Sequence, residues 1–385
     1  MSIGFAMNQI RENYLSKVKR VIIKIGSKAL SNGKTKISRR VIQNLVTSIQ
    51  ELRKRKIEVV LITSGAILAG NEYLNINVKN TNIIKKQVLS SLGQIKLMTI
   101  YSEYFKEKNI LVSQLLLTND IFQDRKRFLN ARATILELLK MDIIPIVNEN
   151  DTVSIDEIMF GDNDILASKV ASMVDAEFLI LLTDIDGLYN GNPKKNKNAK
   201  LISMISEKDF DSNILSDTDD NISAGGMTSK IYAALNVSKF GMPTIIANGM
   251  KKNIISNIFS YKDIGTMIVP SSKFVKNRKK WIGIGLKTSG KIFIDNGAAS
   301  AIIHKGKSLL PSGIKRVQGS FEKGQQVAII NETNLENIAK GLISYSSDEL
   351  NKIIGKKSSQ IQSILGYKYA DEIIHRDNLI IEKTI

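Results

Sequence analysis

Short apolar runs alternate with helix-like segments over the first 270 residues of the chain. Runs of four to six β-branched or apolar residues that end at glycine or polar residues are typical of buried strands, and apolar residues at helical spacing fill the intervals. The expected strands are 20–25, 58–63, 110–117, 143–147, 177–182, 244–246 and 265–269, and the expected helices are 38–55, 85–108 (one or two), 128–140, 162–174 and 227–240. Alternating strands and helices predict an α/β fold, with an open, mostly parallel sheet sandwiched by helices.

The pattern changes after Pro270. A basic connector covers residues 273–280, and short strands with frequent glycine follow it, which predicts a small β-rich domain at the C-terminus. Before the main domain, the N-terminal residues are either a short helical extension or the result of a misassigned start, with Met7 as the other candidate. The predicted parts are an N-terminal extension at 1–18, the α/β domain at 19–270, a basic linker at 271–287 and the β-rich domain at 288–385.

Composition narrows the chemistry that the chain can perform. The hydrophobic content of 43% over 385 residues is ordinary for a globular protein with a large core. Cysteine is absent, which excludes disulfides, thiolate metal sites and cysteine nucleophiles and suits the reducing cytoplasm. With only two histidines, a histidine-based metal site or proton relay is not expected. No apolar run reaches the length of a membrane span, so we expect no contact with a membrane.

The chain is strongly basic, with a formal net charge of +18. Such a balance is typical of proteins that bind nucleic acid or anionic substrates. The excess is spread along a lysine-rich chain, and the region 288–385 holds only 13 Lys and Arg against 10 Asp and Glu. We therefore favour a general composition bias plus a phosphate-binding site, and an RNA-binding protein remains as the alternative from a different class.

Residues 223–230, Ser-Ala-Gly-Gly-Met-Thr-Ser-Lys, are the most informative stretch for chemistry. Two adjacent glycines allow a turn to approach a ligand with its N–H groups exposed. A helix that begins directly after them adds the positive end of its dipole, and Lys230 adds a charge about one turn later. The stretch predicts a phosphate site, although a glycine-rich loop with a surface lysine has the same pattern.

Other polar residues stand where a predicted strand ends or a helix begins. Each has an ordinary explanation as a solvated lysine, a serine N-cap or a turn residue. Their shared position favours a site, because ligands bind outside the carboxyl ends of the strands in open α/β sheets. These residues are Lys24 with Gly26-Ser27, Ser64-Gly65-Ala66, Asn150-Asp151, Gly161-Asp162-Asn163-Asp164 and Thr183-Asp184.

Neither a P-loop nor a dinucleotide-binding glycine motif occurs. Together the features resemble the amino acid kinase superfamily, and within it the glutamate 5-kinase family, from about Lys19 to the C-terminus. The tail, with Gly297-Ala298 and residues 308–314, is similar to a PUA domain, and Ala224 departs from the family where some relatives have Thr. The matching stretches are 21–26, 62–67, 91–94, 127–132, 147–151, 161–164, 182–184 and 225–230.

The resemblance implies ATP-dependent phosphorylation of the γ-carboxylate of L-glutamate, which gives an acyl phosphate. It implies that Lys24 and Lys230 contact the transferred phosphoryl group and that Asp164 holds both lysines. Mg²⁺ would arrive with ATP, and we assign no protein ligand to a metal. The implied ATP-binding residues are Lys24, Thr183, Asp184, Ala224, Gly225, Gly226, Met227, Thr228, Ser229 and Lys230, and the implied glutamate-binding residues are Ser64, Asp151 and Asn163.

Within the superfamily, an acetylglutamate kinase or an aspartokinase is the alternative. The stretch Asn148–Asp151 and the PUA-like tail argue against both. As to partners, the resemblance implies a homo-oligomer, functional coupling to glutamyl phosphate reductase and feedback inhibition by proline. RNA binding by the tail stays open.

Overall fold

The computed structural model describes residues 3–75, 82–154, 163–191, 193, 196, 198–210, 226–271 and 288–382. Two predicted ATP-binding residues, Ala224 and Gly225, lie outside the described residues, as do residues 272–287 of the predicted linker. The chain forms two compact units, Met1–Ile121 with Arg125–Phe274, and Phe122–Asp124 with Val275–Ile385. Each unit has its own sheet and its own apolar core.

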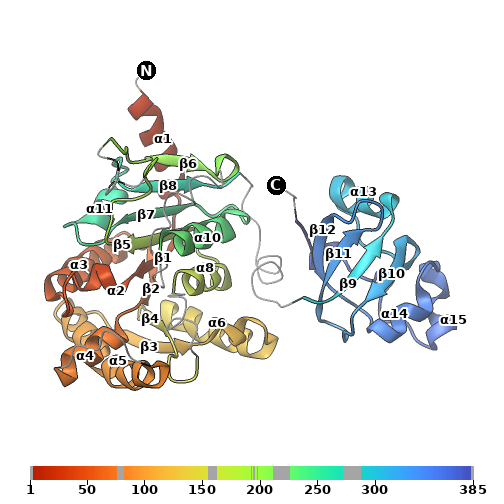
Figure 1. The fold of residues 1–385 in the computed structure, drawn as a ribbon, viewed down its shortest axis with the longest axis horizontal. Coiled ribbons are helices and arrows are strands. Elements are labelled where there is room, and N and C mark those ends of the chain that lie inside the picture. The colour runs from red at the N-terminus through yellow and green to blue at the C-terminus, as the bar shows by residue number, and fades with distance from the viewer. Residues whose placement is uncertain are drawn as a thin grey trace. The chain divides into compact units, whose positions relative to one another are not determined.

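The first unit is built on an eight-stranded sheet in the order β3-β4-β2-β1-β5-β7-β8-β6 (Figure 1). The six strands from β3 to β7 are parallel, and β8 pairs antiparallel with β7 and parallel with β6. The predicted open, mostly parallel sheet is confirmed. Its strands are β1 Arg20–Ile25, β2 Glu58–Thr63, β3 Val112–Leu117, β4 Ile144–Glu149, β5 Phe178–Thr183, β6 Met204–Ser206, β7 Thr244–Asn248 and β8 Thr266–Val269.

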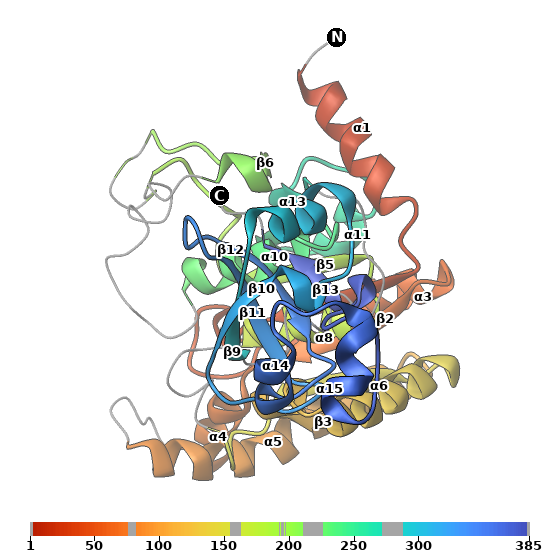
Figure 2. The same ribbon diagram turned by 90° about the vertical axis from the view of Figure 1, so that its right-hand side faces the viewer.

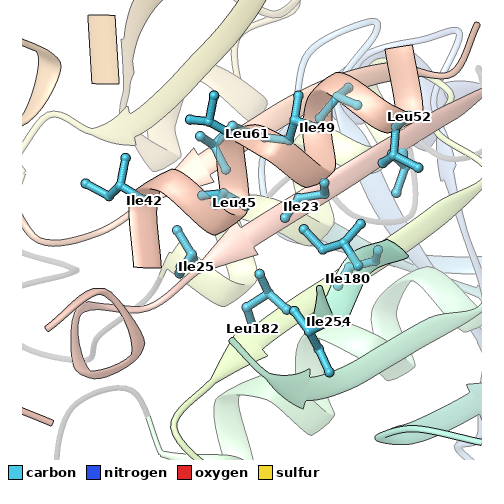
Figure 3. Packing of buried hydrophobic residues seen from close by; sticks show 14 of the residues in the cluster. Ile23, Ile25, Ile42, Leu45, Ile49, Leu52, Leu61, Ile180, Leu182 and Ile254 are labelled. Carbon is cyan, nitrogen blue, oxygen red and sulfur yellow. The ribbon is translucent and has the colours of Figure 1, made fainter. Parts of the chain in front are cut away.

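Helices cover both faces of this sheet, with α3 and α11 on one face and α8 and α10 on the other (Figure 1). Successive side chains of β1 point to opposite faces of the sheet. Ile23 and Ile25 belong to the core under α3 (Figure 3), whereas Lys24 reaches the first turn of α8. The helices are α1 Ile3–Leu15, α2 Ser27–Leu30, α3 Arg39–Lys54, α4 Ala66–Leu74, α5 Ile83–Lys106, α6 Arg125–Lys140, α8 Asn163–Met173, α10 Met227–Ser238 and α11 Ile254–Ile258.

The N-terminal extension is helical and is anchored by a buried arginine. The guanidinium of Arg11 donates to the carbonyl oxygens of Ile264 at 2.8 Å and Ser203 at 2.9 Å, and pairs with Asp263 at 3.0 Å. Leu15 adds an apolar contact with the main core. Helix α1 therefore packs against the segments that lead into β6 and β8.

Two glycines allow α4 and α5 to cross at backbone distance. A Cβ atom at Gly93 would lie 1.8 Å from the carbonyl oxygen of Ala66, and one at Gly70 would lie 2.0 Å from that of Leu89. No larger residue fits either position without moving a helix, so the crossing fixes α5 against the start of α4, directly after β2. Neither α5 nor any other helix in the described part of the chain is long and apolar enough to cross a membrane.

The second unit contains a five-stranded sheet in the order β10-β9-β11-β12-β13. Only β9 and β11 pair in parallel. Helix α13 lies at one end of the sheet and α14 and α15 lie at the other (Figures 1 and 2), which confirms the predicted β-rich domain. The elements are β9 Thr288–Ile294, α13 Asn296–Lys305, β10 Ile314–Gln318, β11 Gln326–Asn331, β12 Asn337–Leu342, α14 Ser347–Ile353, α15 Ile361–Leu365 and β13 Leu379–Ile381.

Candidate active site

The predicted site residues of the first unit gather at one edge of its sheet. Lys24 lies in β1, Ser64 follows β2, Asp151 comes two residues after β4, and Thr183 ends β5. Parallel strands place their carboxyl ends at a common edge, which explains why residues far apart in sequence meet there. Two helices begin at the same edge, α8 with Asn163 and Asp164, and α10 with Met227 to Lys230 in its first turn.

Two lysines share one carboxylate at the start of α8. The Nζ atom of Lys24 lies 2.7 Å from Oδ1 of Asp164, and Nζ of Lys230 lies 3.0 Å from Oδ2. The hydroxyl of Ser229 also donates to Oδ2, at 2.8 Å. The three ionic side chains are nearly inaccessible, with 4%, 6% and 0% of the side-chain surface of Lys24, Lys230 and Asp164 exposed. The structure thus brings the three predicted catalytic residues together.

The ammonium groups of Lys24 and Lys230 keep Asp164 ionised. Burial raises the pKa of this carboxyl, but the attraction of Lys24 and Lys230 and their hydrogen bonds outweigh burial and lower the pKa to about 2. Asp164 is therefore ionised at neutral pH and both lysines stay close to it. Two positive charges against one negative charge leave the cluster with an excess of one positive charge, which suits a polyphosphate.

Next to this cluster, an amide network joins β2, β4 and α5 to α8. The Nδ2 group of Asn163 donates to the carbonyl oxygen of Thr63 at 3.1 Å, to the hydroxyl of Ser64 at 2.9 Å and to Oδ1 of Asn148 at 2.9 Å. Asn148 in turn donates from Nδ2 to Oε1 of Gln94 at 2.8 Å. Predicted substrate residues Ser64 and Asn163 are thus in direct contact, and both are buried.

Asp151 is a buried carboxylate with an unused acceptor. Its Oδ2 accepts a hydrogen bond from Ser90, while its Oδ1 has no hydrogen-bond partner among the described residues. Burial raises the pKa of Asp151, and the hydrogen bond from Ser90 offsets this only in part. An ionised carboxylate in such a place favours a cationic ligand, because a buried charge is costly unless it is paired.

The other predicted ATP-binding residues that the structure describes lie at the end of β5 and at the start of α10. The hydroxyl of Thr183 donates to Oδ1 of the half-buried Asp184 at 3.0 Å. Gly226 is the N-cap residue of α10 and has no side chain to cap the helix. The first turn of α10 therefore presents backbone N–H groups beside Lys230, as an anion site requires.

Three residues that the sequence did not assign to the site belong to it: Ser90, Gln94 and Asn148. Ser90 and Gln94 are buried polar residues four positions apart on one side of α5. Two polar residues at helical spacing on an otherwise apolar face are the signal that could have identified them. Asn148 lies inside β4, because that strand extends two residues beyond its predicted end at Val147.

Comparisons with known proteins identify the family of the chain. The sequence profile of the amino acid kinase family matches residues 19–248, and that of the PUA domain matches residues 290–365. The glutamate 5-kinase of Geobacter sulfurreducens is 42% identical over 97% of this chain and 100% of its own length. The glutamate 5-kinase of Thermoanaerobacter sp. is 46% identical over 94% of this chain and 97% of its own length, and that of Syntrophus aciditrophicus is 44% identical over 97% of each.

Proposed function

The chain belongs to the glutamate 5-kinase family of the amino acid kinases, and from this membership we infer its reaction. It transfers the γ-phosphoryl group of ATP to the γ-carboxylate of L-glutamate and forms L-glutamyl 5-phosphate, the first step of proline biosynthesis. The observation that carries this function is the similarity to glutamate 5-kinases over nearly the full length of the chain.

We assign the cluster of Lys24, Asp164 and Lys230 to the ATP side of the site. A carboxylate must approach a phosphoryl group that already carries negative charge, so repulsion between the two anions is the main obstacle. Phosphoryl transfer needs positioning and charge stabilisation more than covalent chemistry. Two lysines held by one carboxylate supply positive charge at fixed positions, and this arrangement supports their role at the transferred group.

The ATP side also includes Thr183, Asp184 and the segment from Ala224 to Lys230 in this proposal. The uncapped start of α10 supports phosphate binding there. Mg²⁺ would arrive with ATP and be held mainly by its phosphates, where it would neutralise part of their charge. We propose no protein ligand for it.

We assign Ser64, Asp151 and Asn163 to L-glutamate. The free Oδ1 atom of Asp151 supports this residue as the partner of the α-ammonium group. The N–H groups that follow Gly65, at the start of α4, suit a carboxylate. No general base is required, because the γ-carboxylate is ionised at neutral pH and attacks as it stands.

Replacement of Asp151 tests the position of the amino acid. We expect Asp151→Asn to raise KM for glutamate about 10- to 100-fold, because a hydrogen bond to a charged group contributes about 1.5–3 kcal/mol. KM for ATP and the melting temperature should change little, since asparagine can still accept from Ser90. Unchanged affinity for glutamate in Asp151→Asn or Asp151→Ala would place the ammonium group elsewhere.

The raised pKa of Asp151 also predicts how glutamate binding depends on pH. As the pH falls through this pKa, Asp151 takes up a proton and loses the charge that binds the ammonium group. The kcat/KM for glutamate should therefore fall in the wild type as the pH is lowered through this raised pKa, while the same profile for Asp151→Asn lacks this step. An identical step in both proteins would assign the titration to another group.

A panel of carboxylate acceptors tests the function itself. Purified protein is incubated with MgATP, hydroxylamine and L-glutamate, L-aspartate or N-acetyl-L-glutamate, and the trapped hydroxamate is measured. We expect hydroxamate from L-glutamate at a rate far above that from the other two acids. Preference for N-acetyl-L-glutamate or L-aspartate would indicate an acetylglutamate kinase or an aspartokinase instead.

We propose the same domain limits as the sequence predicts, 1–18, 19–270, 271–287 and 288–385, and a cytoplasmic location. A homo-oligomer, coupling to glutamyl phosphate reductase, inhibition by proline and RNA binding by the PUA-like domain stay predictions.

A further inference from the structure

One face of α5 supports the glutamate side of the site with three polar residues. Ser90 donates to Asp151, Gln94 accepts from Asn148, and the hydroxyl of Tyr101 lies 2.9 Å from Oγ1 of Thr63. Spacings of four and seven residues place the three on the same side of the helix. Each touches a segment at the carboxyl end of β2 or β4, so α5 is positioned to orient the residues that we assign to glutamate.

Gln94 supports the orientation of the Asn148 amide, together with the backbone N–H of Glu149. Its Oε1 accepts from Nδ2 of Asn148 at 2.8 Å, which leaves Oδ1 of Asn148 as an acceptor for two donors. These donors are Nδ2 of Asn163 and the backbone N–H of Glu149, both at 2.9 Å. A reversed Asn148 amide would place its NH₂ group against both donors and its oxygen against that of Gln94, so every contact would become unfavourable.

Asn148 and the backbone carbonyl of Thr63 together set the orientation of Asn163. Because Nδ2 of Asn163 is engaged by the acceptors Thr63, Ser64 and Asn148, the other amide atom, Oδ1, is the remaining acceptor. This Oδ1 is buried and has no hydrogen-bond partner among the described residues, like Oδ1 of Asp151. Two buried, unused acceptors that belong to the glutamate side match the donors of an α-ammonium group.

We propose that Gln94 is a positioning residue for amino acid recognition. Through Asn148 it holds the Asn163 amide with Oδ1 available to the α-ammonium group, and so it favours an α-amino acid over a dicarboxylate that lacks the amine. This inference rests on the proposed function, since the amino acid is glutamate. This role requires only an acceptor at Oε1, so Gln94→Glu should preserve it and Gln94→Leu should abolish it.

The test compares Gln94→Leu with Gln94→Glu, using L-glutamate and glutarate, which is glutamate without its amine. In Gln94→Leu, we expect kcat/KM for L-glutamate to fall about 10-fold through KM, as expected for loss of about 1.4 kcal/mol. Activity on glutarate and KM for ATP should stay within about twofold of the wild type. Gln94→Glu should restore the preference for glutamate to within about threefold. Gln43→Leu makes the same change at an exposed position of α3 and should alter nothing.

Wild-type preference in Gln94→Leu would overturn the proposal, as would equal loss of preference in Gln94→Glu. Equal loss on both substrates would indicate a merely structural role and would overturn it as well. If Gln94→Leu does not fold, Gln94→Met retains the side-chain length and takes its place in the comparison with Gln94→Glu. A wild type that does not phosphorylate L-glutamate would reject the proposed function, whereas an active wild type with unaffected variants rejects only the role of Gln94.

Discussion

Lys230→Ala is expected to fold and to lose nearly all turnover. Its ammonium group lies 3.0 Å from Asp164 and is buried at the start of α10, beside the backbone N–H groups that we assign to ATP phosphates. Removal of one charge-stabilising donor from a transition state typically lowers kcat about 10²- to 10³-fold. Because Asp164 keeps its contact with Lys24, the remaining carboxylate is still paired, and the loss of stability should be modest.

Steady-state kinetics and thermal unfolding of purified Lys230→Ala measure both effects. Lys239→Ala, at the C-terminal end of the same helix, is the matched control and should keep wild-type kcat. Lys24→Ala should lose turnover to a similar extent as Lys230→Ala, since Lys24 contacts the other oxygen of the Asp164 carboxylate. Near-normal kcat in either lysine variant would remove that lysine from the transferred phosphoryl group.

Asp164→Asn should combine a large loss of activity with a large loss of stability. The variant leaves two buried ammonium groups close together without their shared carboxylate, and breaking a buried ion pair from one side costs about 3–5 kcal/mol. The pKa of about 2 predicts the pH dependence. In the wild type, this carboxylate contributes about 2 kcal/mol that is fully present above the unfolded-state pKa and is lost as the pH falls toward about 2.

Urea unfolding of the wild type and Asp164→Asn between about pH 7 and pH 2 tests this account. We expect the variant to be less stable at neutral pH, with the difference shrinking as the pH falls. Asp175→Asn is the control, because Asp175 forms a partly exposed pair with Arg132 and should contribute about 1 kcal/mol or less. Equal stability of Asp164→Asn and the wild type at neutral pH would show that the lysines do not depend on this carboxylate.

The parallel part of the fold could be predicted because each strand is a short buried run that ends in polar or glycine residues. The order of the strands in the sheet could not be predicted. The residues of Val21–Ile25 do not indicate that β1 pairs with β2 and β5. The close crossing of α4 and α5 also escaped prediction. Gly70 and Gly93 lie inside helices, although glycine has a low helix propensity. The close approach of α4 and α5 at these two positions explains why glycine is there.

Of the site, the residues at strand ends and helix starts could be predicted, and the structure joins Lys24 to Asp164 and Lys230. The roles of Gln94 and Asn148 could not, although both lie in stretches that match the family. Gln94 lies within α5 and Asn148 within β4, where a polar side chain resembles any tolerated core exception until its partners are known. The hydrogen bond that joins them connects residues 54 positions apart in sequence.

Transfer of an oxygen atom from glutamate to phosphate tests the central claim most directly. L-Glutamate labelled with ¹⁸O in its γ-carboxylate is incubated with MgATP, hydroxylamine and the purified protein, and the phosphate released is analysed by mass spectrometry. If a carboxylate oxygen attacks the γ-phosphoryl group, hydroxylamine then cleaves the bond between carbon and the bridging oxygen, and each phosphate carries one ¹⁸O atom. Phosphate without ¹⁸O would show that water, not glutamate, accepts the phosphoryl group, and would contradict the account.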